Sequence, residues 1–74
     1  MPHVNVKLYP GRTEEQKQAL TQRIIEAMDE TLGVASKYVT VAFEEVSPED
    51  WHDIVVKPEL EGKKALLYKQ PEYL

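Results

Sequence analysis

The spacing of apolar residues changes twice along this chain, and the order of the changes restricts the folds it can adopt. From His3 to Tyr9 apolar and polar residues alternate, which is typical of a strand. From Leu20 to Leu32 apolar residues recur at every fourth position, which is typical of an amphipathic helix. From Tyr38 to Val46 β-branched and aromatic residues predominate, and these favour a second strand. The pattern therefore predicts strand, helix and strand in that order.

Residues with known preferences for helix ends support this order. Thr13 precedes Gln16 with the spacing of a capping box, so the first helix is expected to begin after Thr13. Gly33 follows the last apolar residue of the helical stretch and suits a left-handed C-terminal cap. Ser47 followed by Pro48 predicts the start of another helix.

The last third of the chain gives weaker signals. The helix expected after Pro48 leads into Trp51. We expect Pro58 to begin a further short helix that ends at Gly62, because proline is favoured in the first turn of a helix. Residues 65–68 are expected to form a short strand or a helical turn. The tail from Gln70 to Leu74 is expected to be loose unless it docks on a neighbour.

The predicted fold class is α/β (α+β), with one domain over residues 1–74. It consists of a β-α-β unit with two parallel strands and a packed helix, joined by a right-handed connection. Two strands and one helix do not make a stable sheet alone. A chain of 74 residues without cysteine usually needs a metal or partner chains, and two histidines are too few for a structural metal site. Oligomerisation is therefore expected to complete a larger sheet.

The charge balance restricts the expected partners. The chain has 9 basic and 13 acidic residues, a net charge of −4, and its basic residues are scattered. Nucleic acid and anionic membranes are therefore not expected as partners. There is no apolar run long enough to span a membrane and no signal-peptide pattern at the N-terminus, so a cytoplasmic protein is expected.

Pro2 is the best candidate for a chemical group. Removal of Met1 would leave Pro2 with a free secondary amine, held rigidly by its own ring at the head of the first strand. An amine acts as a base only when unprotonated, and an ordinary α-amino pKa is about 8. Burial among apolar side chains, or a nearby cation such as Arg12, would lower that pKa. The alternative is that Pro2 merely starts a strand that needs no N–H at this position.

Pro2, the alternating strand, Gly11-Arg12, the capped helix and the second strand together resemble the tautomerase superfamily. The resemblance is to the 4-oxalocrotonate tautomerase group and its longer PptA-like relatives. It runs from Pro2 through Trp51, about two-thirds of the chain, and the stretch PHVNVKLYPGRTEEQK is its most specific part. The tail after Trp51 also looks PptA-like.

The resemblance implies roles for individual residues. Pro2 would be the catalytic base, and Arg12 would bind a substrate carboxylate, for which a planar guanidinium is suited. The family's second arginine falls on Thr40, so that role is missing. The aromatic residue of the pocket falls on Trp51, which could also be core filler. Tyr38, before the second strand, could donate a hydrogen bond to a substrate oxygen in place of the arginine.

These roles predict a cofactor-independent isomerase with no metal. The expected reaction is keto–enol tautomerisation of a small 2-oxo acid, such as an arylenolpyruvate or a 2-hydroxydienoate. One carboxylate is expected, because nothing obvious replaces the second arginine. A homodimer is favoured, as the PptA-like tail suggests, and a trimer of dimers is the other expected assembly. The alternative is a non-enzymatic assembly or ligand-binding module on the same scaffold.

Overall fold

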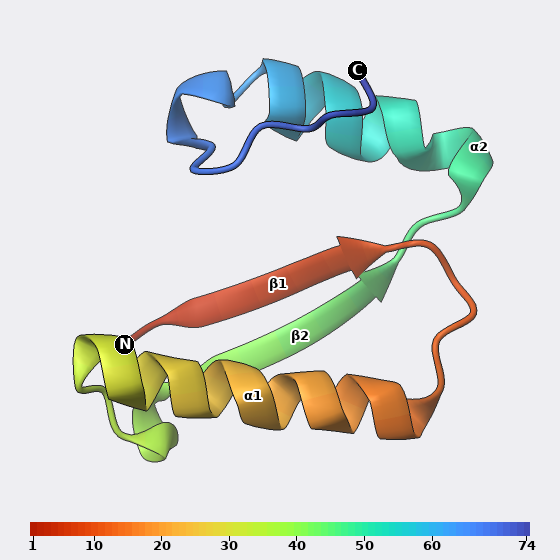
Figure 1. The fold of residues 1–74 in the computed structure, drawn as a ribbon. Helices are drawn as coiled ribbons and strands as arrows, with labels where there is room; N and C mark the ends of the chain where they lie inside the picture. Colours follow the sequence, from red (N-terminus) through yellow and green to blue (C-terminus); the bar gives the residue numbers. More distant parts are fainter.

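Two parallel strands lie between a long helix on one side and a C-terminal helical segment on the other (Figure 1). The computed structural model describes residues 1–74. The strands pair in parallel over their full length, from His3 opposite Thr40 to Leu8 opposite Glu45. The elements, in chain order, are β1 (His3–Leu8), α1 (Glu14–Leu32), the 3-10 turn η1 (Ser36–Tyr38), β2 (Thr40–Glu45), α2 (Pro48–Trp51), the π-type helix η2 (His52–Glu61) and the 3-10 turn η3 (Lys64–Leu66). The predicted β-α-β unit is confirmed.

The ends of α1 lie where the sequence predicts them. The Gln16 amide donates to Thr13 Oγ1 at 3.1 Å, and the Thr13 amide donates to Gln16 Oε1 at 2.9 Å. This reciprocal capping box satisfies two backbone donors that the first turn of a helix leaves free. At the other end Gly33 is left-handed, with φ of 68°, and its amide donates to the Asp29 carbonyl at 3.0 Å. Both caps are therefore confirmed.

The two faces of the sheet differ in polarity. On one face Leu8 and Phe43 line a hollow together with Leu20 of α1. The opposite face carries hydrogen-bonded polar pairs: His3 Nδ1 with Thr40 Oγ1 at 2.6 Å, and Asn5 Nδ2 donating to Glu44 Oε1 at 3.1 Å. The helix side of the sheet is therefore apolar, and polar contacts organise the other side.

The second strand begins later than predicted. Tyr38 lies in η1, where its amide donates to the Ala35 carbonyl at 3.0 Å, and β2 begins at Thr40. The Thr40 amide donates to the Pro2 carbonyl at 3.2 Å, just before the first residue of β1. Residues before Thr40 have no opposing strand to pair with, because β1 has not yet begun. β-branched and aromatic composition indicated a strand here, but pairing decides where it starts.

The sequence predicted that Pro58 begins a short helix. This is wrong, because Pro58 lies inside η2. The wide turn continues past it, with the Gly62 amide donating to the Lys57 carbonyl at 3.0 Å, five residues back. Proline disrupts an α-helix by losing an N–H and by crowding the preceding turn. A π-type turn re-routes the hydrogen bonds. Gly62 ends the segment as predicted, and a Cβ there would lie 2.5 Å from the Pro58 carbonyl oxygen.

The C-terminal segment docks on its own chain. Lys7 of β1 forms an ion pair with Glu59 of η2, and Trp51 Nε1 donates to the Tyr73 hydroxyl at 3.3 Å. The tail has no helix or strand over residues 70–74, but it docks at Tyr73, and this contact lies within one chain. The predicted helical turn near residue 65 is present as η3. No helix is both long enough and apolar enough to cross a bilayer.

The chain buries very little of itself. Only Val46, Val55 and Val56 are buried, and α1 has no buried residue. Leu20 and Leu32 on α1 are 43% and 64% exposed. Each strand also has one edge without a partner, and unpaired edges readily accept a further strand. The single chain therefore offers apolar and backbone surface to another subunit.

We expect the melting temperature of this protein to rise with protein concentration. If association supplies the missing burial, mass action stabilises the folded state more as the chain becomes more concentrated. Thermal unfolding over a hundredfold range of concentration, with light scattering at each point, measures this. A melting temperature that is constant across the range, with a monomeric mass, would contradict the expectation.

Candidate functional site

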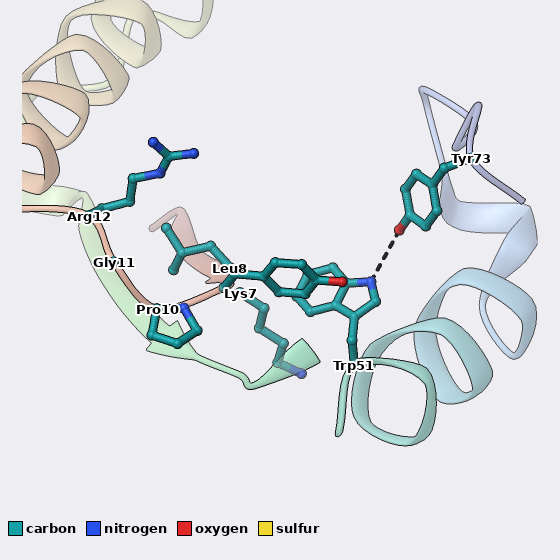
Figure 2. Close-up of a pocket in the computed structure, with 8 residues that line it drawn as sticks. Lys7, Leu8, Pro10, Gly11, Arg12, Trp51 and Tyr73 are labelled. Atoms are coloured by element: carbon teal, nitrogen blue, oxygen red, sulfur yellow. Dashed lines mark hydrogen bonds between the residues drawn. The ribbon is translucent and has the colours of Figure 1, made fainter. Parts of the chain in front are cut away.

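The largest cavity lies at the carboxyl end of β1, where the strand leads into the loop before α1 (Figure 2). Its volume of about 660 Å³ is within the usual range for small-molecule sites. Three parts of the chain meet there: the end of β1 with its loop, the end of α2, and the C-terminal tail. The lining residues are Lys7, Leu8, Tyr9, Pro10, Gly11, Arg12, Trp51 and Tyr73.

One side of the cavity is aromatic. The rings of Tyr9 and Trp51 meet edge to face, with centroids 5.1 Å apart and an interplanar angle of 84°. Tyr73 approaches Trp51 from the tail, and its hydroxyl accepts the indole N–H. Edge-to-face rings attract each other beyond their apolar burial. Trp51, which is half-buried, is thus held from two directions.

The other side of the cavity is cationic. Figure 2 shows Arg12 across the cavity from Trp51 and Tyr73. Gly11 before it has φ of 122°, a conformation that side chains with a Cβ rarely adopt, so glycine lets the loop turn there. Arg12 takes part in none of the four ion pairs. Its guanidinium is therefore available for an anionic ligand.

Lys7 lines the same cavity but is already paired. The hydrogen bond and charge of Glu59, with a smaller contribution from Glu44, raise the pKa of Lys7 above its ordinary value of 10.5, against an opposing effect of burial. Lys7 is therefore a compensated cation at neutral pH. Arg12 is left as the uncompensated positive charge of the cavity.

The remaining candidate residues lie at the opposite end of the sheet. Pro2 is half-buried and held by its carbonyl to the Thr40 amide. The Thr40 side chain is bonded to His3. Tyr38 is 45% exposed, and Lys37 Nζ lies 5.1 Å from the centre of its ring.

The structure therefore divides the five candidates into two groups. Arg12 and Trp51 share the cavity, whereas Pro2 lies at the other end of β1 with Thr40 and Tyr38. Leu8 at the cavity lies six residue steps along the strand from Pro2, or about 20 Å at the usual rise of ~3.3 Å per residue. One chain does not bring the proline to the arginine.

Tyr9 and Tyr73 were missed as cavity residues. Tyr9 ends the alternating stretch beside Pro10-Gly11, and this turn is the signal that could have placed it next to Arg12. Tyr73 carries no such signal. Its contact with Trp51 joins residues 22 positions apart, in a tail with no regular pattern.

Comparison with known proteins bears on this fold and cavity. Residues 2–59 match the family model described as tautomerase enzyme. A probable tautomerase of Xylella fastidiosa is 40% identical over 73 residues, which cover 99% of this chain and 89% of the relative. Tautomerase PptA of Klebsiella pneumoniae is 39% identical over 74 residues, covering 99% of this chain and 97% of the relative.

Solved structures of 4-oxalocrotonate tautomerase homologues are also similar to this chain. TomN, a 4-oxalocrotonate tautomerase homologue in the tomaymycin biosynthetic pathway, superimposes with a TM-score of 0.65 at 33% identity, over 86% of this chain and 95% of TomN. YwhB, another homologue of 4-oxalocrotonate tautomerase, gives a TM-score of 0.59 at 41% identity, over 62% of this chain and 75% of YwhB.

The fold and these relationships thus define a small α/β isomerase of the keto–enol tautomerase class. The chain belongs to the tautomerase family. A non-enzymatic module on this scaffold, the alternative considered from the sequence, is not favoured by these relationships.

We expect Glu59→Gln to destabilise the protein at neutral pH but not at very high pH. The pair raises the pKa of Lys7, so its stabilisation is fully present below about pH 10.5, the unfolded value. It is lost as pH rises through the raised folded value. Urea unfolding of wild type and variant, at one protein concentration and several pH values, measures the difference.

Glu72→Gln is the matched control, because it removes a carboxylate from the Lys69–Glu72 pair, whose side chains are 81% and 86% exposed. Exposed pairs contribute little to stability, so this variant should unfold like wild type. Equal stability of Glu59→Gln and wild type at pH 7 would mean that the Lys7 pair does not hold the C-terminal segment.

Proposed function

We propose that this tautomerase interconverts the enol and keto forms of a 2-oxo acid with one carboxylate, such as an arylenolpyruvate or a 2-hydroxydienoate. The observation that carries the proposal is the polarity of the cavity. Arg12 is an uncompensated cation on one side, and Trp51 is part of an aromatic wall on the other. A carboxylate suits the guanidinium, which can hold both of its oxygens, and an apolar or aryl group suits the wall.

The cavity lacks a base of its own. Its lining includes no carboxylate and no histidine. Lys7 is the only amine there, and Glu59 raises its pKa, which keeps the amine protonated. A general base works best when its pKa lies near the working pH. The base is therefore expected to come from outside this set of residues.

Pro2 would supply that base after removal of Met1. While Met1 is attached, the Pro2 nitrogen is a tertiary amide and has essentially no basicity. Once free, the amine takes the proton of the enol hydroxyl and returns a proton to a carbon of the conjugated system, a 1,3-proton transfer that consumes nothing else. The hydrogen bond from the Thr40 amide to the Pro2 carbonyl anchors this residue at the head of β1.

The distance of about 20 Å along β1 implies that Pro2 and Arg12 in one site come from two chains. A neighbouring subunit whose strand runs in the opposite direction would bring its Pro2 to the Arg12 end of this one. The unpaired edges of β1 and β2 and the exposed apolar residues of α1 support such an assembly. A homodimer is the smallest form that completes the site.

The residues beside Pro2 favour a substrate with one charged group. Thr40 occupies the position of the family's second arginine, and its hydroxyl is bonded to His3 Nδ1 at 2.6 Å. This pair offers hydrogen bonds but no permanent charge. Tyr38, exposed nearby, would donate its hydroxyl to the substrate oxygen. A second carboxylate would have no guanidinium to meet it.

We expect Pro2→Ala to lower kcat/KM on phenylenolpyruvate by at least about a hundredfold, the lower range for loss of a general base. A primary amine differs from proline in both basicity and orientation. The loss of enol absorbance measures the rate. Intact mass must first show that Met1 is absent from both proteins, and full activity in the variant would remove Pro2 from the mechanism.

We expect Arg12→Ala to reduce kcat/KM by about 10- to 100-fold, in line with loss of a charge-assisted hydrogen bond of roughly 1.5–3 kcal/mol. If Arg12 binds substrate and transition state equally, KM rises; if it stabilises developing charge, kcat falls. Steady-state kinetics on phenylenolpyruvate separate the two.

Arg23→Ala is the control, because Arg23 is an exposed arginine on α1 outside the cavity. It should behave like wild type. Unchanged kinetics in Arg12→Ala would show that the guanidinium does not hold the substrate.

A further inference from the structure

We infer that Tyr73 determines substrate specificity by forming the outer wall of the aromatic end of the cavity. This inference rests on the proposed function, because it assigns the aryl end of the ligand to a named side chain. Tyr73 belongs to the tail, yet it lines the same cavity as Arg12 and Trp51. The C-terminal tail is thus part of the binding site.

The contacts of Trp51 give the geometry. The rings of Tyr9 and Trp51 form a T-shaped pair with centroids 5.1 Å apart, and the Tyr73 hydroxyl lies 3.3 Å from the indole nitrogen. Figure 2 shows the Tyr73 hydroxyl directed at the indole nitrogen. Three aromatic rings from three segments of the chain therefore line the end of the cavity away from the guanidinium.

The direction of the hydrogen bond matters for ligand chemistry. An indole N–H only donates, so the Tyr73 oxygen is the acceptor. The phenolic hydrogen of Tyr73 remains free to donate in another direction. Tyr73 is 64% exposed in the single chain, so a ligand ring can still cover it. This wall favours an aryl group over a short alkyl chain.

Only part of the tail has this role. Tyr68, five residues earlier, is fully exposed and lines none of the four main hollows of the chain. Lys69 and Glu72 pair with each other on the surface. Tyr68 is therefore a tyrosine from the same segment without the contact, and it serves as a matched control.

The test compares Tyr73→Ala and Tyr68→Ala with wild type on two enols: phenylenolpyruvate, and the enol of 2-oxobutanoate, which has the carboxylate but no ring. Tyr73→Ala should raise KM for the aryl substrate by about tenfold, with less than a twofold change on the alkyl substrate. Tyr68→Ala should match wild type on both. An equal loss on the two substrates, or no loss on the aryl one, would overturn the inference.

A binding measurement separates the inference from the proposed reaction. Trp51 is the single tryptophan, so its fluorescence reports ligand at the wall. With 3-phenylpropanoate as the probe, Tyr73→Ala should bind about tenfold more weakly than wild type and Tyr68→Ala. If neither enol is turned over but this difference remains, the proposed function fails and the role of Tyr73 stands. If binding is equal in all three proteins, the role of Tyr73 is wrong, whatever the activity.

Discussion

The scarcity of buried surface in a single chain governs the rest of this structure. Val46, Val55 and Val56 are the only buried residues; two of them belong to η2, and none belongs to α1. The long helix and the sheet meet without enclosing a core of their own. Small domains without disulfides or metals have little burial to offset chain entropy. In this chain the same shortage leaves open the surfaces through which the candidate site would be completed.

The two faces of the sheet contribute differently to that site. The α1 face supplies apolar contact, whereas the opposite face carries the pairs His3–Thr40, Asn5–Glu44 and Lys7–Glu59. The last pair fastens η2 to β1, and η2 continues directly from the helix that bears Trp51. An ion pair on the polar face thereby supports the aromatic wall of the cavity. It also compensates Lys7, which leaves Arg12 as the free cation.

The parts of the fold that could be predicted from the sequence are those set by residues close together in the chain. The cap at Thr13, the stop at Gly33 and the start at Pro48 depend on residues a few positions apart, and all three are observed. Arg12 and Trp51 came from the family resemblance, and the structure places them together. The π-type turn around Pro58 and the docking of Tyr73 could not be predicted. They depend on contacts between residues far apart in sequence or on hydrogen bonding outside the usual helix.

The arrangement also suggests how the site would discriminate between acids. In the proposed reaction one guanidinium would meet one carboxylate at the cavity, whereas Thr40 and His3 at the Pro2 end offer neutral hydrogen bonds. A second carboxylate would lose water without gaining a counter-charge, and burying an unpaired charge costs several kcal/mol. An aryl group would lose little on desolvation and would gain contact with Trp51 at the aromatic side of the cavity. Threonine at position 40, where the family resemblance places an arginine, would therefore select substrates with one carboxylate. It would do so by disfavouring a second carboxylate as much as by favouring an aryl group.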